Sequence, residues 1–139
     1  MNPDRIRDLA TRYTAAWCSQ NAAHVAAHFA EHGSLTINGG MPAIGRPAIT
    51  ASAQGFMTAF PDMIVAMDRL VLSDSELNDP DAVYHWTLTG TNSGPGGTGK
   101  RVKISGREEW TIGADELVAA SLGYYDAEEY ARQLKNGYR

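Results

Sequence analysis

Residues 82–112 read AVYHWTLTGTNSGPGGTGKRVKISGREEWTI, and this stretch decides the fold. Ala82–Thr91 and Arg101–Ile112 are rich in β-branched and aromatic residues, which predicts two long strands. The segment 92–99 holds too many glycines to keep ladder geometry, so we expect a flexible hairpin connection between them. It is not a phosphate-binding loop, because Gly99-Lys100 leads into another strand instead of a helix.

Two further strands flank this hairpin, at Met63–Leu72 and Leu117–Tyr125, and four consecutive strands predict an antiparallel meander. Helices are expected before and after it. Apolar residues at three- and four-residue spacing mark one helix near the N-terminus and another from Pro47 to Phe60. The order of elements predicts an α+β fold. The stripe of the first helix comprises Ile6, Leu9, Ala10, Tyr13, Ala16 and Trp17.

The shorter elements are predicted from their end signals. Asn21 is expected to open a second helix that carries Val25, Ala26 and Phe29 and is ended by Gly33. A brief extended stretch, 34–38, follows it. A last helix is expected from Ala127 to about Lys135.

Length and composition predict one globular domain spanning residues 1–139. The formal net charge is −4 and the basic residues are scattered, so we expect no nucleic-acid partner. Cys18 is the only cysteine, which excludes an intrachain disulfide. The first residues lack the apolar stretch of a signal peptide, and no run is long enough to span a membrane. We therefore expect a cytoplasmic protein that does not associate with membranes.

Several short motifs in the second half resemble the SnoaL-like branch of the nuclear-transport-factor-2 (NTF2) superfamily. A strand ends in Gly-Thr-Asn-x-Gly, a Thr-Gly-Lys restart follows, and the last hairpin ends in Gly-Tyr-Tyr-Asp. The first half matches more loosely. The motifs are Gly90-Thr91-Asn92-x-Gly94, Thr98-Gly99-Lys100, Gly106, Glu109-Trp110-x-Ile112 and Gly123-Tyr124-Tyr125-Asp126.

The resemblance implies a cone-shaped fold, in which N-terminal helices pack on the concave face of a curved antiparallel sheet around one apolar pocket. It also implies a homodimer that needs no cofactor. Polyketide cyclases of this family close a ring by intramolecular aldol condensation, with an acid/base aspartate after the last strand that matches Asp126. The superfamily also includes ketosteroid isomerases, epoxide hydrolases and proteins without a known reaction, so the fold does not decide the function.

Two residues are candidate catalytic groups. Asp126 is a candidate acid/base, but Asp126-x-x-Glu129 is also a capping-box arrangement, in which the aspartate would cap the last helix. Tyr13 lies in an Arg-Tyr-x-Ala-Ala segment that matches the ketosteroid isomerase helix, whose tyrosine donates a hydrogen bond to the developing oxyanion. Alternatively, Tyr13 belongs to the core. The isomerase base position reads Ile37, and Gly123 stands where epoxide hydrolases carry an essential aspartate.

Further residues are expected around the substrate. Arg107 and Glu109 share one face of their strand, opposite Glu108 and Trp110, and either project into the pocket or form a solvated charge pair. His85 is a candidate proton donor or a structural histidine. The residues expected to line the substrate pocket are Trp17, Phe56, Phe60, His85, Arg107, Glu109 and Tyr124.

The segment His28-Phe-Ala-Glu31-His32, preceded by His24, fits an inverted zinc-peptidase motif. We interpret it as a chance match, because the helix is short and Gly33 ends it at once, and we expect no metal. Our first hypothesis is an enzyme with cyclase- or isomerase-like acid/base chemistry on a hydrophobic carbonyl compound. The alternative is a non-catalytic protein that binds a small hydrophobic molecule, and an epoxide hydrolase-like reaction ranks below both.

Overall fold

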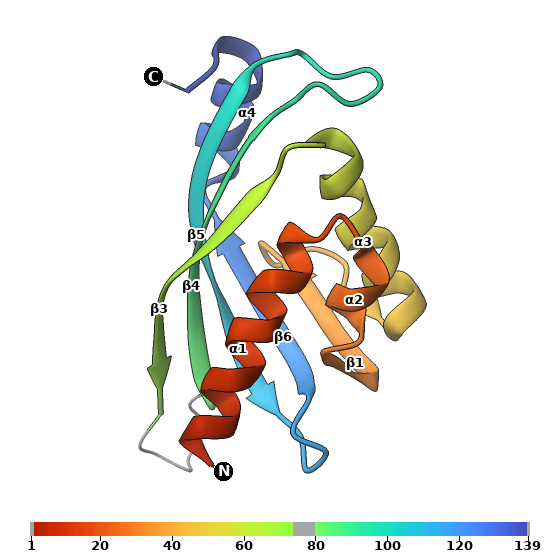
Figure 1. Cartoon of the computed structure of the whole chain (residues 1–139), viewed down its shortest axis with the longest axis vertical. Coiled ribbons are helices and arrows are strands. Elements are labelled where there is room, and N and C mark those ends of the chain that lie inside the picture. Colours follow the sequence, from red (N-terminus) through yellow and green to blue (C-terminus); the bar gives the residue numbers. More distant parts are fainter. Residues whose placement is uncertain (1, 74–79, 139) are drawn as a thin grey trace.

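The computed structural model describes residues 2–73 and 80–138. Within these residues it contains four helices and one six-stranded sheet (Figure 1). The helices are α1 (Pro3–Cys18), α2 (Ala22–Ala26), α3 (Arg46–Ala59) and α4 (Ala127–Asn136). The strands are β1 (Phe29–Ile37), β2 (Ala43–Ile44), β3 (Ile64–Leu72), β4 (Ala82–Thr91), β5 (Arg101–Ile112) and β6 (Val118–Tyr125).

The sheet has the strand order β2-β1-β6-β5-β4-β3. The predicted meander is confirmed, because β3, β4, β5 and β6 pair in sequence and antiparallel. The expectation of a wholly antiparallel sheet is wrong in one place, where β1 runs parallel to β6 from Phe29 opposite Val118 to Ile37 opposite Gly123. The sheet is therefore mixed, with one parallel pair of strands among antiparallel pairs.

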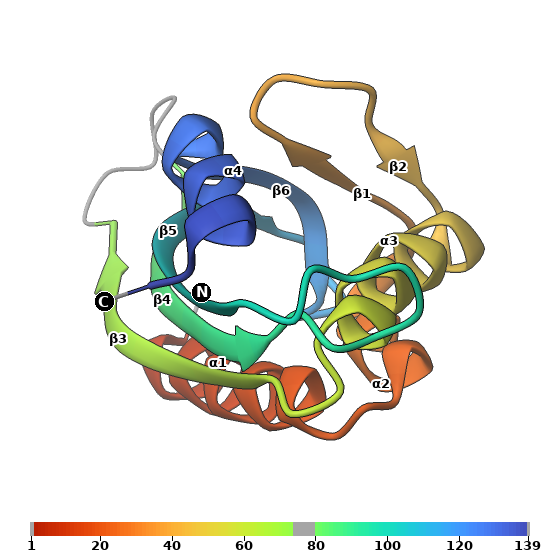
Figure 2. The ribbon, with the colours of Figure 1, turned by 90° about the horizontal axis from the view of Figure 1, so that it is seen from above.

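The sheet is strongly curved and remains open, as the view from above shows (Figure 2). Bulges lie between Met67 and Arg69 and between Thr111 and Ile112, and bulges bend a strand and increase its twist. The helices α1, α2 and α3 lie on one side of the sheet, against its inner face (Figure 1). The helix α4 packs against β5. The α+β class and the cone-like fold predicted from the sequence are confirmed.

The helix α1 follows its sequence pattern. Asn2 caps it by accepting a hydrogen bond from the Asp4 N–H at 2.9 Å, and Pro3 occupies the first turn, where a missing N–H costs nothing. All members of the predicted apolar stripe are buried. They are Ile6, Leu9, Ala10, Tyr13, Ala16 and Trp17.

The second helix ends earlier than predicted. It stops at Ala26, and Phe29 opens β1 instead of continuing the helix. Gly33 therefore caps no helix. A Cβ at Gly33 would lie 2.9 Å from the Val118 carbonyl oxygen, so the glycine permits the close approach of β1 to β6. Because residues 29–32 are extended, the apparent zinc motif lacks the helical geometry it requires.

The glycine-rich loop joins β4 to β5, as expected of a hairpin connection, and it is also hydrogen-bonded to the end of α3. The side chain of Asn92 donates a hydrogen bond to the Ala59 carbonyl at 3.1 Å and accepts one from the Thr98 N–H at 2.8 Å. Gly94 donates its N–H to the same Ala59 carbonyl at 3.3 Å. The start of the loop therefore packs against the C-terminal end of α3. None of the helices in the described ranges is long and apolar enough to span a bilayer.

Gly94 provides a test of this packing. A Cβ at Gly94 would lie 1.9 Å from the Thr58 carbonyl oxygen, whereas one at the exposed Gly55 of α3 would meet no heavy atom within 4 Å. We predict that Gly94→Ala lowers the free energy of unfolding by about 1–3 kcal/mol, as overpacking does. Gly55→Ala should raise it by about 1 kcal/mol through helix propensity. Urea denaturation measures both, and equal stability of the two variants would contradict the packed loop.

Candidate functional site

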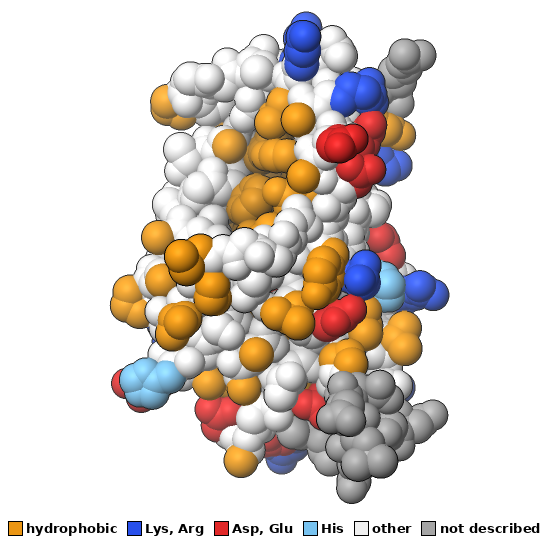
Figure 3. All heavy atoms as spheres, turned by 180° about the vertical axis from the view of Figure 1, so that it is seen from behind, with side chains coloured by type: hydrophobic (Ala, Val, Ile, Leu, Met, Phe, Trp, Pro, Cys, Tyr) orange, Lys and Arg blue, Asp and Glu red, His pale blue; other side chains and the backbone are white. Residues whose placement is uncertain are grey.

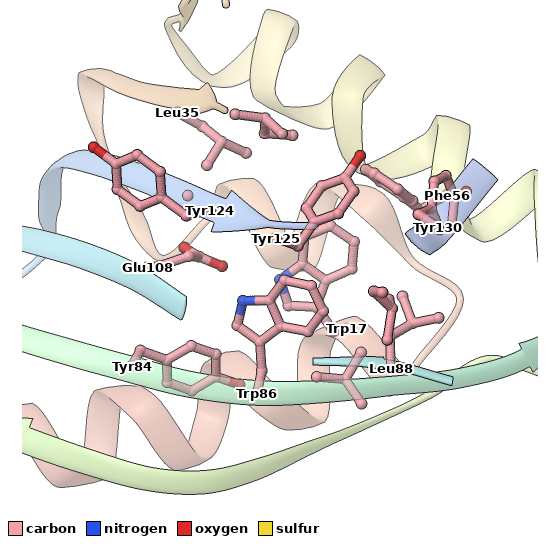
Figure 4. Close-up of a pocket in the computed structure, with 14 residues that line it drawn as sticks. Trp17, Leu35, Phe56, Tyr84, Trp86, Leu88, Glu108, Tyr124, Tyr125 and Tyr130 are labelled. Atoms are coloured by element: carbon pink, nitrogen blue, oxygen red, sulfur yellow. The ribbon is translucent and has the colours of Figure 1, made fainter. Parts of the chain in front are cut away.

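A cavity of about 70 Å³ lies on the inner face of the curved sheet (Figure 4). Its wall is apolar and aromatic except for the carboxyl group of Glu108. Strands β1, β3, β4, β5 and β6 contribute to it, together with helices α1, α3 and α4. The lining residues are Trp17, Leu35, Ile37, Phe56, Val65, Tyr84, Trp86, Leu88, Ile104, Glu108, Gly123, Tyr124, Tyr125 and Tyr130.

Glu108 reaches the cavity because of strand alternation. Along β5 the inner face carries Ile104, Glu108 and Trp110, all of them buried. Two inner-face residues near Glu108 are glycines, and the side chains they lack make space for their neighbours. A Cβ at Gly106 would lie 2.5 Å from the Trp86 ring, and one at Gly123 would lie 3.8 Å from Glu108 Cγ.

Three donors from three elements hold the Glu108 carboxyl group. The Tyr13 hydroxyl of α1 donates to Oε1 and Oε2 at 3.0 and 3.1 Å. Trp110 Nε1 donates to Oε1 at 3.0 Å, and the Ser121 hydroxyl of β6 donates to Oε1 at 2.8 Å. Oε1 therefore accepts all three hydrogen bonds, whereas Oε2 receives only that of Tyr13. Oε2 keeps the greater capacity to bind a guest.

The environment of Glu108 disfavours its charged form. Burial raises the pKa of Glu108, and the hydrogen bonds from Trp110, Ser121 and Tyr13 oppose that shift without cancelling it. Among residues 2–73 and 80–138, no cationic side chain forms an ion pair with Glu108. The carboxyl group therefore titrates closer to neutral pH than an exposed glutamate, which suits a general acid or base.

Tyr13 lies behind Glu108 and does not line the cavity. Its side chain is fully buried among aromatic rings, edge-on to Trp110 at a centroid distance of 5.2 Å. Burial, and then the adjacent Glu108, raise the pKa of Tyr13 well above its usual value. The hydroxyl thus stays protonated and donates to Glu108. That Tyr13 donates a hydrogen bond to a substrate oxyanion stays a prediction. In this structure its hydroxyl donates to the Glu108 carboxyl group.

Asp126 adopts the capping arrangement. Its Oδ1 accepts a hydrogen bond from the Glu129 N–H at 3.0 Å, and the residue is exposed at the start of α4. It lies beside an open groove on the outer face of the sheet, together with Asn38, His85 and Arg107. Asp126 is not among the residues that line the inner cavity.

The remaining predicted site residues divide between the two faces. Trp17 and Phe56 line the cavity, and Phe60 is fully buried without lining it. Tyr124 borders both the cavity and the outer groove, and its ring lies 4.4 Å from the Arg107 guanidinium. Of the remaining three, His85 and Arg107 border the outer groove only and Glu109 borders neither hollow.

The pair of Arg107 and Glu109 faces outward, which selects the solvated alternative. Arg107 Nε lies 3.2 Å from Glu109 Oε2, and both side chains are partly exposed. On the same face, burial and then the charges of Arg69 and Arg107 lower the pKa of His85. The expectation that Arg107 and Glu109 project into the inner cavity is therefore not supported by their position. Figure 3 shows one face of the molecule on which apolar, basic, acidic and histidine side chains are interspersed.

Glu108 is not among the site residues predicted from the sequence. Strand alternation predicts Glu108 and Trp110 on one face of β5, as observed, but it does not decide which face is inside. Trp110 was the available signal, because a tryptophan in a central strand favours the buried face and carries Glu108 with it. In the described part of the chain, no group of three or more His, Cys, Asp or Glu side chains could hold a metal ion.

The geometry defines the class of protein: an NTF2-like cone with a carboxyl group inside. Solved structures show the same fold. A hypothetical protein with a ketosteroid isomerase-like fold from Catenulispora acidiphila DSM 44928, in complex with trimethylamine, has a TM-score of 0.77 at 16% identity, covering 96% of this chain and 93% of that one. A putative SnoaL-like polyketide cyclase from Jannaschia sp. CCS1 has a TM-score of 0.80 at 16% identity, covering 99% and 98%.

A third similar structure is the epoxide hydrolase/cyclase-like enzyme SalBIII of pyran ring formation in salinomycin, with a TM-score of 0.75 at 14% identity, covering 92% and 95%. No curated protein matches the sequence significantly. The SnoaL-like domain model matches residues 10–121. The chain belongs to the SnoaL-like family, and the resemblance predicted from its motifs is confirmed.

The raised pKa of Glu108 has a consequence for stability. A carboxyl group whose pKa is higher in the folded than in the unfolded protein stabilises the fold below the unfolded pKa, and this contribution is lost as pH rises through the folded pKa. We predict that the melting temperature of the wild type falls relative to Glu108→Gln as pH rises from 4.5 towards 8. Parallel melting profiles of the two proteins across this range would contradict the assignment.

Proposed function

We propose that this SnoaL-like chain transfers protons on a small hydrophobic carbonyl compound bound in the inner cavity. The observation that carries the proposal is the buried Glu108, the one acidic or basic side chain among the cavity-lining residues. The apolar wall favours a hydrophobic guest. The names of the Jannaschia structure and of SalBIII support carbonyl or ring-forming chemistry, and the trimethylamine complex supports a small organic ligand.

In the proposed reaction, Glu108 acts as the acid/base group. As a carboxylate, it removes a proton from the carbon next to the carbonyl, and the electron pair of the C–H bond moves to form an enolate. Glu108 becomes neutral, the form its surroundings favour. Glu108 then trades this proton for one from the solvent and protonates the same carbon, which gives exchange. In a guest whose enolate is conjugated with a double bond, it can protonate another carbon, which gives isomerisation. In a guest with a second carbonyl, the enolate carbon attacks it, and Glu108 protonates the new alkoxide.

Other residues position the acid/base group in this proposal. Tyr13, Trp110 and Ser121 direct their donors to Glu108 and so fix the orientation of its carboxyl plane. Oε2, with its spare capacity, is the oxygen that exchanges the proton. The cavity volume of about 70 Å³ selects compact guests, because larger ones require the aromatic side chains to move. Asp126 keeps the structural role of capping α4.

Enolisation of a simple ketone tests this proposal. The protein is incubated with cyclopentanone in deuterated buffer, and the exchange of the α-protons is followed by NMR. The wild type should accelerate exchange above the buffer rate. Glu108→Gln should reduce the protein-dependent rate by about 10²-fold or more, the usual contribution of a general base. Asp126→Asn should retain most of the rate, because it removes an exposed carboxylate outside the cavity, and asparagine can still cap α4.

Three other outcomes carry distinct meanings. Loss of exchange in Asp126→Asn alone would contradict the assignment to Glu108 and favour the aspartate predicted from the sequence. Equal rates in the wild type and Glu108→Gln would also contradict it. If the ketone raises the melting temperature but exchange does not exceed the buffer rate, the chain is a binding protein without turnover on this compound.

A further inference from the structure

The walls of the cavity form an aromatic box. The rings do not lie in one plane: the interplanar angle is 65° between Trp86 and Tyr125, 76° between Tyr125 and Tyr130, and 70° between Trp17 and Phe56. Their centroids are 5.5–6.2 Å apart, so neighbouring rings meet edge to face. Figure 4 shows these side chains surrounding the same hollow as Glu108.

Two features of this box can attract positive charge: its aromatic ring faces and the carboxyl group of Glu108. The faces of aromatic rings are negative and bind cations, most strongly when water is excluded. Glu108 adds a full negative charge when ionised, and no described cationic side chain is paired with it. The nearest arginine in sequence, Arg107, faces the opposite side of the sheet, where it pairs with Glu109 and lies over Tyr124. Within the described ranges, the carboxylate thus has hydrogen-bond donors but no counter-ion.

The chemistry of the walls selects an organic cation over a metal ion. Metal ions such as Ca²⁺ and Mg²⁺ need several oxygen ligands, and Glu108 is the one carboxyl group among the lining residues. A methylated ammonium ion is weakly hydrated, and its methyl groups pack against aromatic rings. The volume of about 70 Å³ limits the guest to a few heavy atoms.

We infer that the cavity is a binding site for a small methylated ammonium ion, which occupies the aromatic box as the counter-ion of Glu108. The cation lies beside Oε2, the oxygen that receives a hydrogen bond from Tyr13 alone. This inference goes beyond the proposed reaction, because cation binding requires Glu108 in the cavity wall but no catalysis by it. The two guests exclude each other, since the ketone needs the space that the cation fills.

Tetramethylammonium is the probe, because its charge is permanent at every pH. Binding is measured by calorimetric titration at constant ionic strength, with tert-butyl alcohol as a neutral guest of similar shape. The wild type should bind tetramethylammonium at least tenfold more tightly than tert-butyl alcohol. Glu108→Gln should lose at least tenfold of the affinity for the cation while its weaker affinity for the alcohol stays within about twofold, a difference of about 1.4 kcal/mol or more.

Glu109→Gln is the matched control, because it removes the same charge one residue away on the outer face. It should leave cation binding within about twofold of the wild type. A second variant, Trp86→Leu, removes an aromatic wall and keeps Glu108, and it should weaken the cation more than the alcohol.

Equal affinities for the two guests, or equal losses in Glu108→Gln and Glu109→Gln, would overturn the inference. Undetectable cation binding by the wild type would also overturn it. Ketone exchange is measured on the same protein preparation without the cation. If exchange occurs but the cation does not bind, the inference of an ammonium site is wrong and the proposed reaction stands. Retained binding of tert-butyl alcohol by Glu108→Gln shows that the variant is folded.

Discussion

The structure depends on one desolvated carboxyl group at the centre of a curved sheet. Glu108 is brought inside by the alternation of β5, and it is held there by hydroxyl and indole donors from α1, β5 and β6. A buried carboxyl group without partners would destabilise the fold, so these donors are a condition for its presence. The contact of α1 with the inner face of the sheet, through Tyr13, is thereby structural, and in the proposed function it also positions the acid/base group.

The same group gives the cavity two electrostatic states. When neutral, Glu108 can donate a hydrogen bond to a carbonyl oxygen, and when ionised it can accept a proton or pair with a cation. Burial brings these states closer in free energy than they are for an exposed glutamate at neutral pH. In the two proposals, the choice of guest is therefore coupled to the protonation of one side chain.

Much of the fold could be predicted from the sequence, because the signals were local. The bounds of β4 and β5 agree with the prediction, and the apolar stripe of α1 and the capping residue of α4 were identified. The error at residues 27–33 has a non-local cause. Phe29 becomes extended because β1 pairs with β6, a strand about 90 residues away, and no local pattern encodes that parallel pairing.

The site was harder to predict than the fold, for a related reason. Alternation divides β5 into two faces, but which face is inside depends on the curvature of the whole sheet. The family resemblance predicts Asp126 as the acid/base group, yet its side chain accepts a hydrogen bond from the first turn of α4. Glu108 belongs to none of the family motifs, and its proposed role depends on Tyr13 and Ser121, residues that only the tertiary structure brings to it.

The most direct measurement is the ionisation of Glu108 itself. Protein labelled with ¹³C at the glutamate side-chain carboxyl carbon is titrated by NMR, and the Glu108 signal is identified by its loss in Glu108→Gln. We predict that this signal titrates with a midpoint above the ordinary glutamate pKa of 4.5 and above the midpoints of the exposed glutamates in the same sample. A midpoint at or below 4.5 would contradict this prediction, because burial would then not disfavour the charged form of Glu108.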